Sequence, residues 1–208
     1  MGGFFMRKSR IRVCIILVIV LFESCGIIVL QSNIIKTGMK ENEKRKYQDK
    51  TERMIEDDIK CFPVMQQYCN EITMEDDYGN SRINGKHEGL DIMYKRNKTG
   101  VIPIVSATDG VIQNIGWLYL GGYRIGILAN SGIYYYYAHF DSYVPGLYVG
   151  KDVKAGEFLG FMGNSGEGEE GTKGKFPVHL HFGIYIKDKN GNENTLNPYP
   201  FLSKINSE

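Results

Sequence analysis

The sequence predicts an all-β domain, a small and mostly antiparallel sheet or open barrel, that follows an N-terminal transmembrane helix and a helical stalk. Three observations support this prediction. Short apolar and aromatic runs separated by glycine turns fill the chain from about Ile83 onward. A long apolar run follows a basic N-terminus. Between these two regions lies a charged stretch without glycine or proline.

The composition excludes some classes of protein. The chain has 208 residues, enough for one ordinary domain with appendages, and a formal net charge of +1 at pH 7. Basic residues do not gather with aromatic residues in any segment, so we do not expect a nucleic acid as a partner. The 14 tyrosines and 25 glycines, against six prolines, favour short strands and glycine turns over a helix bundle.

Residues 1–12 are predicted to be a basic cytoplasmic N-terminus, and residues 13–31 a transmembrane signal-anchor. The second segment is almost entirely apolar. A helix of about 18 residues spans roughly 27 Å, close to the hydrocarbon core of a bilayer at about 30 Å. Because a basic flank stays in the cytoplasm, the chain would be a single-pass protein of the cell membrane with an extracellular C-terminal domain.

Two alternatives to the uncleaved anchor are open, because a carboxylate at Glu23 would cost about 2.5–3.5 kcal/mol in the middle of a bilayer. One is a cleaved signal peptide with residues 13–22 as its apolar region, although no A-x-A site follows. The other is a lipid-modified Cys25, although Glu23 stands where that signal has a small residue. We favour the anchor.

Residues 32–75 are predicted to be a charged helical stalk or linker. Residues 40–60 are mostly charged and mix both signs, which is typical of a solvated helix; a dedicated binding helix is the alternative. For Cys61 and Cys69 two readings are open, a disulfide in an oxidising compartment or two small buried thiols. Their spacing does not match a zinc motif.

Residues 76–203 are predicted to be the folded domain. Its strand candidates are “GVIQNIG”, “YRIGILAN”, “IYYYYAHF”, “EFLGFMGN” and “HLHFGIYI”. Asn130, Ser131 and Gly132 separate two of these runs and are typical of a hairpin turn. Strands at this spacing favour an antiparallel sandwich or an open barrel.

The histidines indicate a functional site. The chain has four, at positions 87, 139, 179 and 181. Residues i and i+2 of a strand face the same side, so His179 and His181 project together from a run that should be apolar. A lone strand histidine is more often a satisfied core residue, but two on one face leave several ring nitrogens without partners. A metal ion, or a polar cleft around one, would supply them.

Zinc suits this set of side chains. A catalytic zinc ion commonly takes three histidine or carboxylate ligands and leaves a fourth position open. His87, Asp91 and one of the paired histidines would form such a shell. An HExxH helix is excluded, because Asp91 stands where the second histidine belongs and Gly89 disfavours a helix. Glu88 is then a residue of the rim.

The motifs “HEGLD”, “YAHF” and “HLHF”, in this order, resemble those of the lysostaphin/LytM-type M23 zinc metallopeptidases. The resemblance covers residues 83–202. It implies a small antiparallel sheet crossed by a groove, and the peptide portion of peptidoglycan as substrate. It also implies one zinc ion per chain, with metal ligands His87, Asp91 and His181 and a catalytic pair formed by His139 and His179.

Three features bear on the substrate. Family members run from a small turn directly into “GPHLHF”, whereas the loop here is longer and holds three glutamates between residues 167 and 170. This loop is either a flexible surface loop or a lid that repels acidic substrates. Tyr137, two residues before His139, should share its face and is a candidate substrate contact. Asn164, in the “GNSG” turn, is the second candidate.

Two classes of function follow. The first is a zinc-dependent endopeptidase that hydrolyses peptidoglycan cross-links or stem peptides in cell-wall remodelling. One neutral imidazole would accept the proton of the attacking water, and the other would stabilise the oxyanion or protonate the leaving amine. The alternative is a non-catalytic wall-binding scaffold on the same fold. A scaffold usually loses a ligand or a catalytic histidine, and this chain keeps all five residues, which favours the enzyme.

Overall fold

The computed structural model describes residues 36–83, 85–188 and 191–205. The chain divides into two compact units, Met1–Glu52 and Arg53–Glu208. The predicted cytoplasmic N-terminus and membrane segment, residues 1–12 and 13–31, lie outside the described residues. Among the residues that are described, no helix combines the length and the apolar character needed to cross a membrane.

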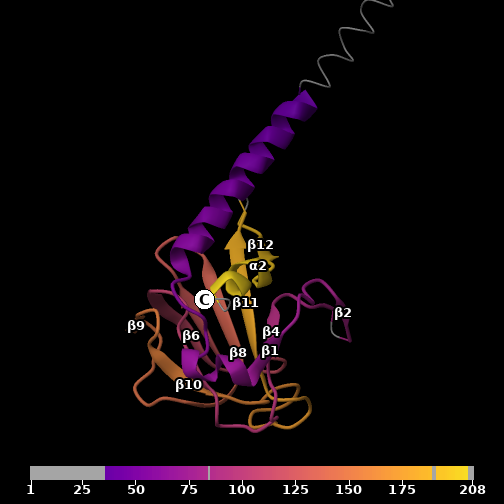
Figure 1. The fold of residues 1–208 in the computed structure, drawn as a ribbon. Helices are drawn as coiled ribbons and strands as arrows, with labels where there is room; N and C mark the ends of the chain where they lie inside the picture. Colours follow the sequence, from indigo (N-terminus) through magenta and orange to yellow (C-terminus); the bar gives the residue numbers. More distant parts are fainter. Residues whose placement is uncertain (1–35, 84, 189–190, 206–208) are drawn as a thin grey trace, which may run out of the picture. The chain divides into compact units, whose positions relative to one another are not determined.

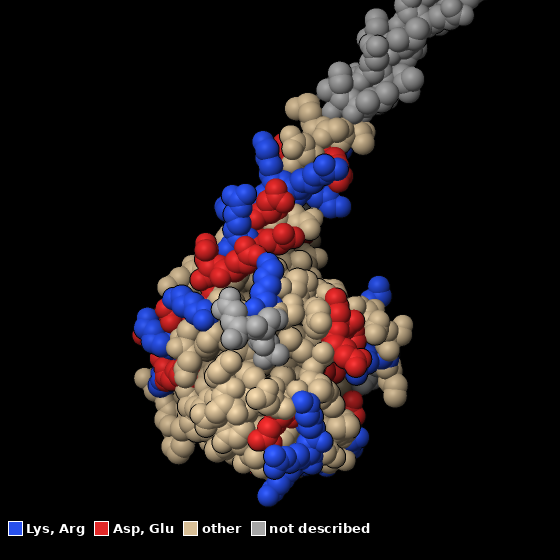
Figure 2. All heavy atoms as spheres, viewed as in Figure 1, with Lys and Arg blue, Asp and Glu red and all other residues tan. Residues whose placement is uncertain are grey.

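In the first unit, residues 36–52 are α-helical, in line with the predicted charged helix. Figure 2 shows acidic and basic side chains mixed along this part of the chain. Glu41 and Arg45 form an exposed ion pair of 3.9 Å, and Gln48 Nε2 donates to Glu52 Oε1 at 3.0 Å. Because exposed i,i+4 pairs contribute only about 0.3–0.5 kcal/mol each, these contacts support a solvated helix rather than a packed one.

Residues 53–75 differ from the predicted stalk, because they belong to the second unit and pack into it. Their buried apolar side chains are Ile55, Ile59, Phe62, Val64 and Ile72. Asp58 accepts hydrogen bonds from Tyr135 Oη at 3.0 Å and from Ser131 Oγ. The folded unit therefore begins near Arg53 rather than at residue 76.

Cys61 and Cys69 are free thiols, so they correspond to the second of the two alternatives for this pair. Sγ of Cys61 donates to the carbonyl oxygen of Ser106 at 3.2 Å. Partial burial raises the pKa of both thiols. The two cysteines act as small, half-buried packing residues.

Ten strands of the described residues form one antiparallel sheet, which confirms the predicted sheet type (Figure 1). They are β1 (Ile72–Met74), β4 (Leu90–Tyr94), β5 (Pro103–Val105), β6 (Gly110–Leu118), β7 (Gly122–Leu128), β8 (Tyr134–Tyr143), β9 (Asp152–Val153), β10 (Phe158–Met162), β11 (His179–Lys187) and β12 (Glu193–Leu196). The main path runs β1-β4-β11-β8-β7-β6-β9, while β10 pairs with β5 and β8, and β12 pairs with β11.

Smaller elements complete the second unit. β2 (Ser81–Arg82) and β3 (Gly85–Lys86) form a separate two-stranded sheet. The 3-10 helix η1 spans Gln66–Glu71, and residues 53–58 are α-helical. The helix α2 spans Tyr199–Ile205 and buries Leu202.

The five predicted strand segments correspond to β6, β7, β8, β10 and β11. The predicted hairpin turn joins β7 to β8. Within it the amide of Ala129 donates to the carbonyl of Ile133 at 2.9 Å, and the amide of Gly132 donates to the carbonyl of Ala129 at 3.0 Å. Gly132 has a φ of 86°, which glycine adopts without steric cost.

The strands β4, β11 and β8 separate the core from the opposite face of the sheet. On the core side lie the fully buried side chains Leu90, Ile92, Tyr135, Tyr137, Leu180, Phe182 and Ile184. Because side chains alternate along a strand, the residues between them face the other way. This second face carries Asp91, Tyr134, Tyr136, His179, His181 and Tyr185, all of which line one groove.

A bulge in β8 interrupts the alternation at His139. Ile125 of β7 stands opposite Tyr137, but Tyr123 stands opposite Phe140, so one residue of β7 faces two of β8. His139 has a φ of 67°, and beyond it Phe140 enters the core with no exposed surface. Bulges of this kind re-aim a side chain, and here the imidazole of His139 turns to the groove.

We expect Ile55→Ala to destabilise the second unit, because Ile55 has no exposed surface and its truncation leaves a cavity. The free energy of unfolding should fall by about 2–5 kcal/mol. Urea denaturation followed by the fluorescence of Trp117 would measure it. Met39→Ala, at a side chain 63% exposed in the first unit, is the control and should not shift the midpoint. Equal midpoints for both variants would contradict the assignment of residues 53–75 to the folded unit.

Candidate active site

Strand pairing brings the three predicted metal ligands together. Asp91 of β4 stands directly opposite His181 of β11, and His87 lies just before β4. Their donor atoms form a nearly regular triangle. His87 Nε2 lies 3.0 Å from Asp91 Oδ1 and 3.1 Å from His181 Nδ1, and His181 Nδ1 lies 3.0 Å from Asp91 Oδ1.

This triangle fits a tetrahedral metal ion. Three ligands bound at about 2.0 Å in tetrahedral geometry lie roughly 3.3 Å from one another. Without an ion, two ring nitrogens and one carboxylate oxygen supply at most two N–H donors for three contacts. One of the contacts would then be repulsive. A divalent cation would satisfy all three lone pairs, so His87, Asp91 and His181 could hold zinc.

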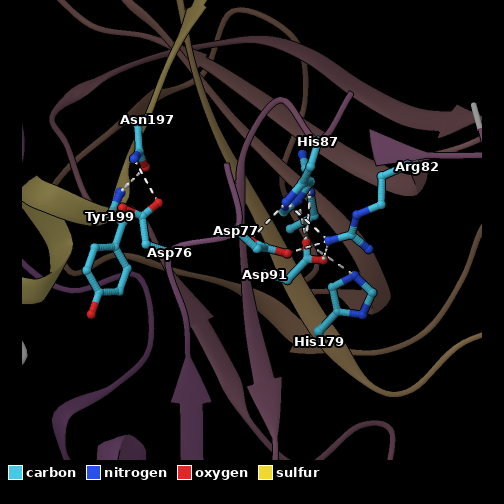
Figure 3. A network of polar contacts seen from close by, with 9 residues as sticks. Asp76, Asp77, Arg82, His87, Asp91, His179, Asn197 and Tyr199 are labelled. Atoms are coloured by element: carbon cyan, nitrogen blue, oxygen red, sulfur yellow. Dashed lines mark hydrogen bonds and ion pairs between the residues drawn. The ribbon is translucent and has the colours of Figure 1, made fainter. Parts of the chain in front are cut away.

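Asp77 and Arg82 contact two of the predicted ligands, His87 and Asp91 (Figure 3). Nδ1 of His87 lies 2.9 Å from Oδ1 of Asp77, a buried oxygen with no other partner among the described residues. When Nε2 of His87 binds a metal, Nδ1 carries the proton and donates a hydrogen bond to this carboxylate. Arg82 Nη2 donates to Asp77 Oδ2 at 2.5 Å and to Asp91 Oδ2 at 2.9 Å. Because Arg82 engages Oδ2 of Asp91, the other carboxylate oxygen, Oδ1, faces the metal position.

Arg82 Nη2 also lies 3.1 Å from Nδ1 of His87. In the tautomer that binds a metal, this nitrogen carries a proton and cannot accept from the guanidinium. We therefore regard the contact as a close approach, and Asp77 as the hydrogen-bond partner of His87. The arrangement fixes the ring orientation of one ligand and the free oxygen of another.

The same contacts set the charge of the ligands. Burial would raise the pKa of Asp91, but the hydrogen bonds from His181 and His87 lower it well below the usual range. Burial would lower the pKa of His87, and the carboxylates of Asp91 and Asp77 raise it. Asp91 is therefore ionised in neutral solution, which a site for a divalent cation requires.

His139 and His179 stand beside the triangle, and backbone carbonyls fix their tautomers. We assign the proton of each ring to Nδ1, which donates to Ser165 O at 2.7 Å from His139 and to Pro177 O at 2.8 Å from His179. Each Nε2 is then a free acceptor. The two ring centroids are 4.6 Å apart, and His179 Nε2 lies 3.6 Å from Asp91 Oδ1.

Burial keeps both of these rings neutral. It lowers the pKa of His139 well below its usual value, and the neighbouring rings of His179 and His181 lower it further. Burial also lowers the pKa of His179, against the opposing charge of Asp91. Two neutral imidazoles with free Nε2 atoms beside a metal position could accept a proton from water.

The site opens into a groove with a volume of about 1160 Å³. The two histidines and the three ligand residues line it together with aromatic side chains from β8 and β11. Glu88, as predicted, is an exposed residue of its lining. The exposed apolar side chains of Ile83, Leu118, Tyr119 and Leu120 lie along the same groove.

The prediction that Tyr137 faces the groove is wrong. Its side chain is fully buried in the core, and its Oη accepts a hydrogen bond from the amide of Ala107 at 2.8 Å. The bulge at His139 places the two residues on different faces of the sheet. Tyr136 lines the groove instead, with its ring centroid 6.1 Å from that of His181.

The loop before β11 is tied to the rest of the unit. Trp117 Nε1 donates to the carbonyl of Gly168 at 3.1 Å, and only the first of the three loop glutamates, Glu167, lines the groove. Asn164, the second predicted substrate contact, is absent from the groove lining, and its carbonyl accepts from the amide of Gly174 at 3.2 Å. Its location in the structure therefore favours a role in the shape of the loop.

Gly89 is part of the site, although the sequence did not suggest it. A Cβ at this position would lie 2.6 Å from both Cε1 and Nε2 of His181, and 2.7 Å from the carbonyl oxygen of Phe182. These distances are shorter than any ordinary van der Waals contact. The glycine between His87 and Asp91 thus leaves room for the third ligand, a requirement that only the fold reveals.

Comparison with known protein families identifies the domain. Residues 85–198, more than half of the chain, match the model described as Peptidase family M23. An L-Ala–D-Glu endopeptidase of Bacillus subtilis (strain 168) is 39% identical over 143 residues, which are 68% of this chain and 41% of that protein. The glycyl-glycine endopeptidase ALE-1 of Staphylococcus capitis is 31% identical over 120 residues, 57% of this chain and 29% of that protein. The chain thus spans less than half the length of these relatives.

Solved structures share the fold. A lytM protein of Ruminococcus gnavus, provisionally described as a glycyl-glycine endopeptidase, has 48% identity and a TM-score of 0.66, and the match covers 73% of this chain and 62% of that one. The catalytic domain of lysostaphin from Staphylococcus simulans has 27% identity and a TM-score of 0.51. That match covers 67% of this chain and 98% of the lysostaphin domain.

We expect Gly89→Ala to weaken zinc binding by at least about tenfold, because the added methyl group displaces His181 from the triangle. Titration against a chromogenic chelator would measure the affinity. Gly38→Ala, where a Cβ meets nothing within 4 Å, is the matched control and should bind zinc as the unmodified chain does. Unchanged affinity in Gly89→Ala would show that His181 is not a ligand.

Tyr137→Phe should lower the free energy of unfolding by about 1–3 kcal/mol, because the buried amide of Ala107 loses its acceptor. Urea denaturation is again the measurement. Tyr136→Phe, on the groove face, is the matched change and should stay within about 0.5 kcal/mol of the unmodified chain. If Tyr136→Phe lowered the free energy of unfolding more than Tyr137→Phe, Tyr137 would have to face the groove rather than the core.

Proposed function

Since the chain belongs to peptidase family M23, we propose that it is a zinc-dependent endopeptidase that hydrolyses peptide bonds of peptidoglycan. The observation that carries the proposal is the triangle of His87 Nε2, Asp91 Oδ1 and His181 Nδ1, with sides of 3.0–3.1 Å. Its position at the floor of an open groove, beside two neutral imidazoles, supports a catalytic rather than a structural metal.

Zinc held by these three residues would supply the Lewis acidity that lowers the pKa of a water molecule to about 7 and polarises a peptide carbonyl. His139 and His179 would carry the proton. Because Nδ1 of each ring is committed to a backbone carbonyl, each Nε2 begins without a proton and first acts as an acceptor. The imidazolium so formed can then donate that proton to the leaving amine, which returns the ring to its starting state.

The groove suits an extended peptide. Its lining combines the exposed apolar side chains of Ile83 and Leu118 with aromatic rings and a few charged groups. An extended chain advances about 3.3 Å per residue, so a groove of this volume accepts several residues on the two sides of the scissile bond. The relatives named as L-Ala–D-Glu and glycyl-glycine endopeptidases support a peptide substrate of the cell wall.

We propose further that residues 13–31 anchor the chain as a single-pass protein of the cell membrane, with the C-terminal unit outside the cell. The support is the order of the sequence, a basic segment of residues 1–12 followed by an apolar run. The charged helical residues 36–52 come next. In this arrangement the enzyme would act on cell wall close to the membrane, which suits a role in cell-wall remodelling.

We expect His139→Ala and His179→Ala to keep one zinc ion per chain and to lose at least about 100-fold in turnover, the usual contribution of a general acid–base group. His181→Ala should lose the zinc itself. Purified cell wall from several sources would be digested and the product masses recorded, with zinc content from elemental analysis. A chelator should stop the unmodified chain, and added zinc should restore it.

Two results would contradict these assignments. Loss of zinc from His139→Ala or His179→Ala would make those residues ligands rather than proton carriers. Intact wall from every source, with one zinc ion bound per chain, would favour the non-catalytic scaffold over the peptidase.

A further inference from the structure

The groove contains a cation that the proposed chemistry does not use. Arg124 of β7 lines the groove, and its Nε and Nη1 are buried without a hydrogen-bond partner. No carboxylate in the described ranges, residues 36–83, 85–188 and 191–205, forms an ion pair with it. Buried charges in proteins are normally paired, so a guanidinium of this kind calls for a partner of opposite charge.

The position of Arg124 follows from the alternation of β7. Ile125 and Ile127 are fully buried in the core, so Arg124 and Leu128 face the groove, which both of them line. Gly126 lies between these two on the same face. Because Gly126 has no side chain, there is space beside the guanidinium of Arg124.

Two tyrosines occupy part of that space. A Cβ at Gly126 would collide with Oη of Tyr134, and a Cβ at Gly121 would collide with Oη of Tyr136. Gly126 is two residues from Arg124 on the same face of β7, so the Tyr134 hydroxyl lies beside Arg124. Arg124, Tyr134 and Tyr136 all line the groove.

The same tyrosines connect Arg124 to the metal ligands. The ring of Tyr136 has its centroid 6.1 Å from that of His181 and 6.0 Å from that of Tyr185. By strand register Arg124 of β7 faces the bulge of β8 that contains His139, and the neighbouring Ala138 pairs with His181 of β11. Neighbouring strands lie about 4.8 Å apart and an extended chain advances about 3.3 Å per residue, so a carboxylate held at Arg124 would belong to a residue about one to three positions from the scissile bond.

We propose that Arg124, flanked by Tyr134 and Tyr136, is a subsite for a carboxylate of the substrate peptide. Guanidinium groups bind carboxylates through two parallel hydrogen bonds, and tyrosine hydroxyls can donate to the same oxygens. The inference rests on the proposed peptidase function and specifies the class of peptide that the enzyme cleaves. An L-Ala–D-Glu bond adjoins an acidic residue, whereas a glycyl-glycine bond does not, so this chain prefers an acidic peptide.

Other charges in the groove do not account for Arg124. Glu193 of β12 lines the same groove and is exposed, and Nε and Nη1 of Arg124 have no hydrogen-bond partner among the described residues. Basic and acidic residues are equally numerous in the lining, which holds Arg82, Lys86, Arg124 and Lys187 against Glu88, Asp91, Glu167 and Glu193. We therefore attribute the preference for an acidic peptide to the position of Arg124 and not to the net charge of the groove.

The test compares two peptides that differ in one group. The first is an L-Ala–D-Glu peptide with its free carboxylate beside the scissile bond, and the second is the same peptide amidated there. The zinc-loaded full chain should cleave the free acid with a kcat/KM about 10- to 100-fold higher. Arg124→Gln should remove the difference between the acid and the amide. An unchanged urea-denaturation midpoint and one bound zinc ion per chain check that the variant is folded.

Two matched variants sharpen the test. Arg124→Lys keeps the charge but not the paired donors, and should retain only part of the preference. Glu193→Gln should keep the full preference or increase it, because it removes a carboxylate from the lining of the groove and leaves Arg124 unchanged. A preference abolished by Glu193→Gln and kept by Arg124→Gln would overturn the subsite.

The failure of the subsite can be distinguished from the failure of the peptidase. Equal cleavage of both peptides by the unmodified chain would overturn the subsite and leave the peptidase intact. If neither peptide is cleaved, calorimetry of both peptides with the zinc-loaded chain decides the question. Binding of the acid at least about tenfold tighter than the amide, lost in Arg124→Gln, would support the subsite without catalysis. Equal binding would overturn it.

Discussion

The antiparallel pairing of β4 with β11 is the interaction on which the site depends. It sets Asp91 opposite His181, and the alternation of β11 adds His179 on the same face. A slip of one residue in this register would turn the ligands into the core. The register is held by buried apolar neighbours on the other face, among them Ile92 and Phe182. The packing of the core and the geometry of the metal ligands therefore depend on the same strand register.

A local departure from regular structure supplies the rest of the site. The bulge in β8 turns His139 toward the groove, and the carbonyls of Ser165 and Pro177 hold the two imidazoles in the tautomer that leaves Nε2 free. Both carbonyls belong to the segment that connects β10 to β11. The conformation of this connection thus sets the proton chemistry, while the strands set the metal geometry.

Sequence periodicity predicted what depends on regular strands and missed what depends on exceptions. Period two along β11 gave the shared face of His179 and His181, because no bulge interrupts that strand. The same rule failed for Tyr137, because the positive φ of His139 shifts the alternation and no residue type in “YAHF” announces it.

Two further features required the folded chain. Ile55 and Ile59 are apolar at i,i+4 spacing within a charged run, and the surrounding charges concealed that they enter the core. The need for glycine at position 89 arises from His181, far away in the sequence, so only the contact between them could show it. The motif “HEGLD” alone predicted two of the ligands, but it did not indicate that a glycine is needed between them to make room for His181.

X-ray absorption spectroscopy at the zinc edge of the zinc-loaded chain tests the proposed ligand set most directly. The spectrum should show one zinc ion per chain with only nitrogen and oxygen neighbours at about 2.0 Å, and multiple scattering from two imidazoles. In His181→Ala the signal of one imidazole should disappear from any zinc that is still bound. Sulfur neighbours, or an unchanged imidazole signal in His181→Ala, would contradict the proposed ligand set.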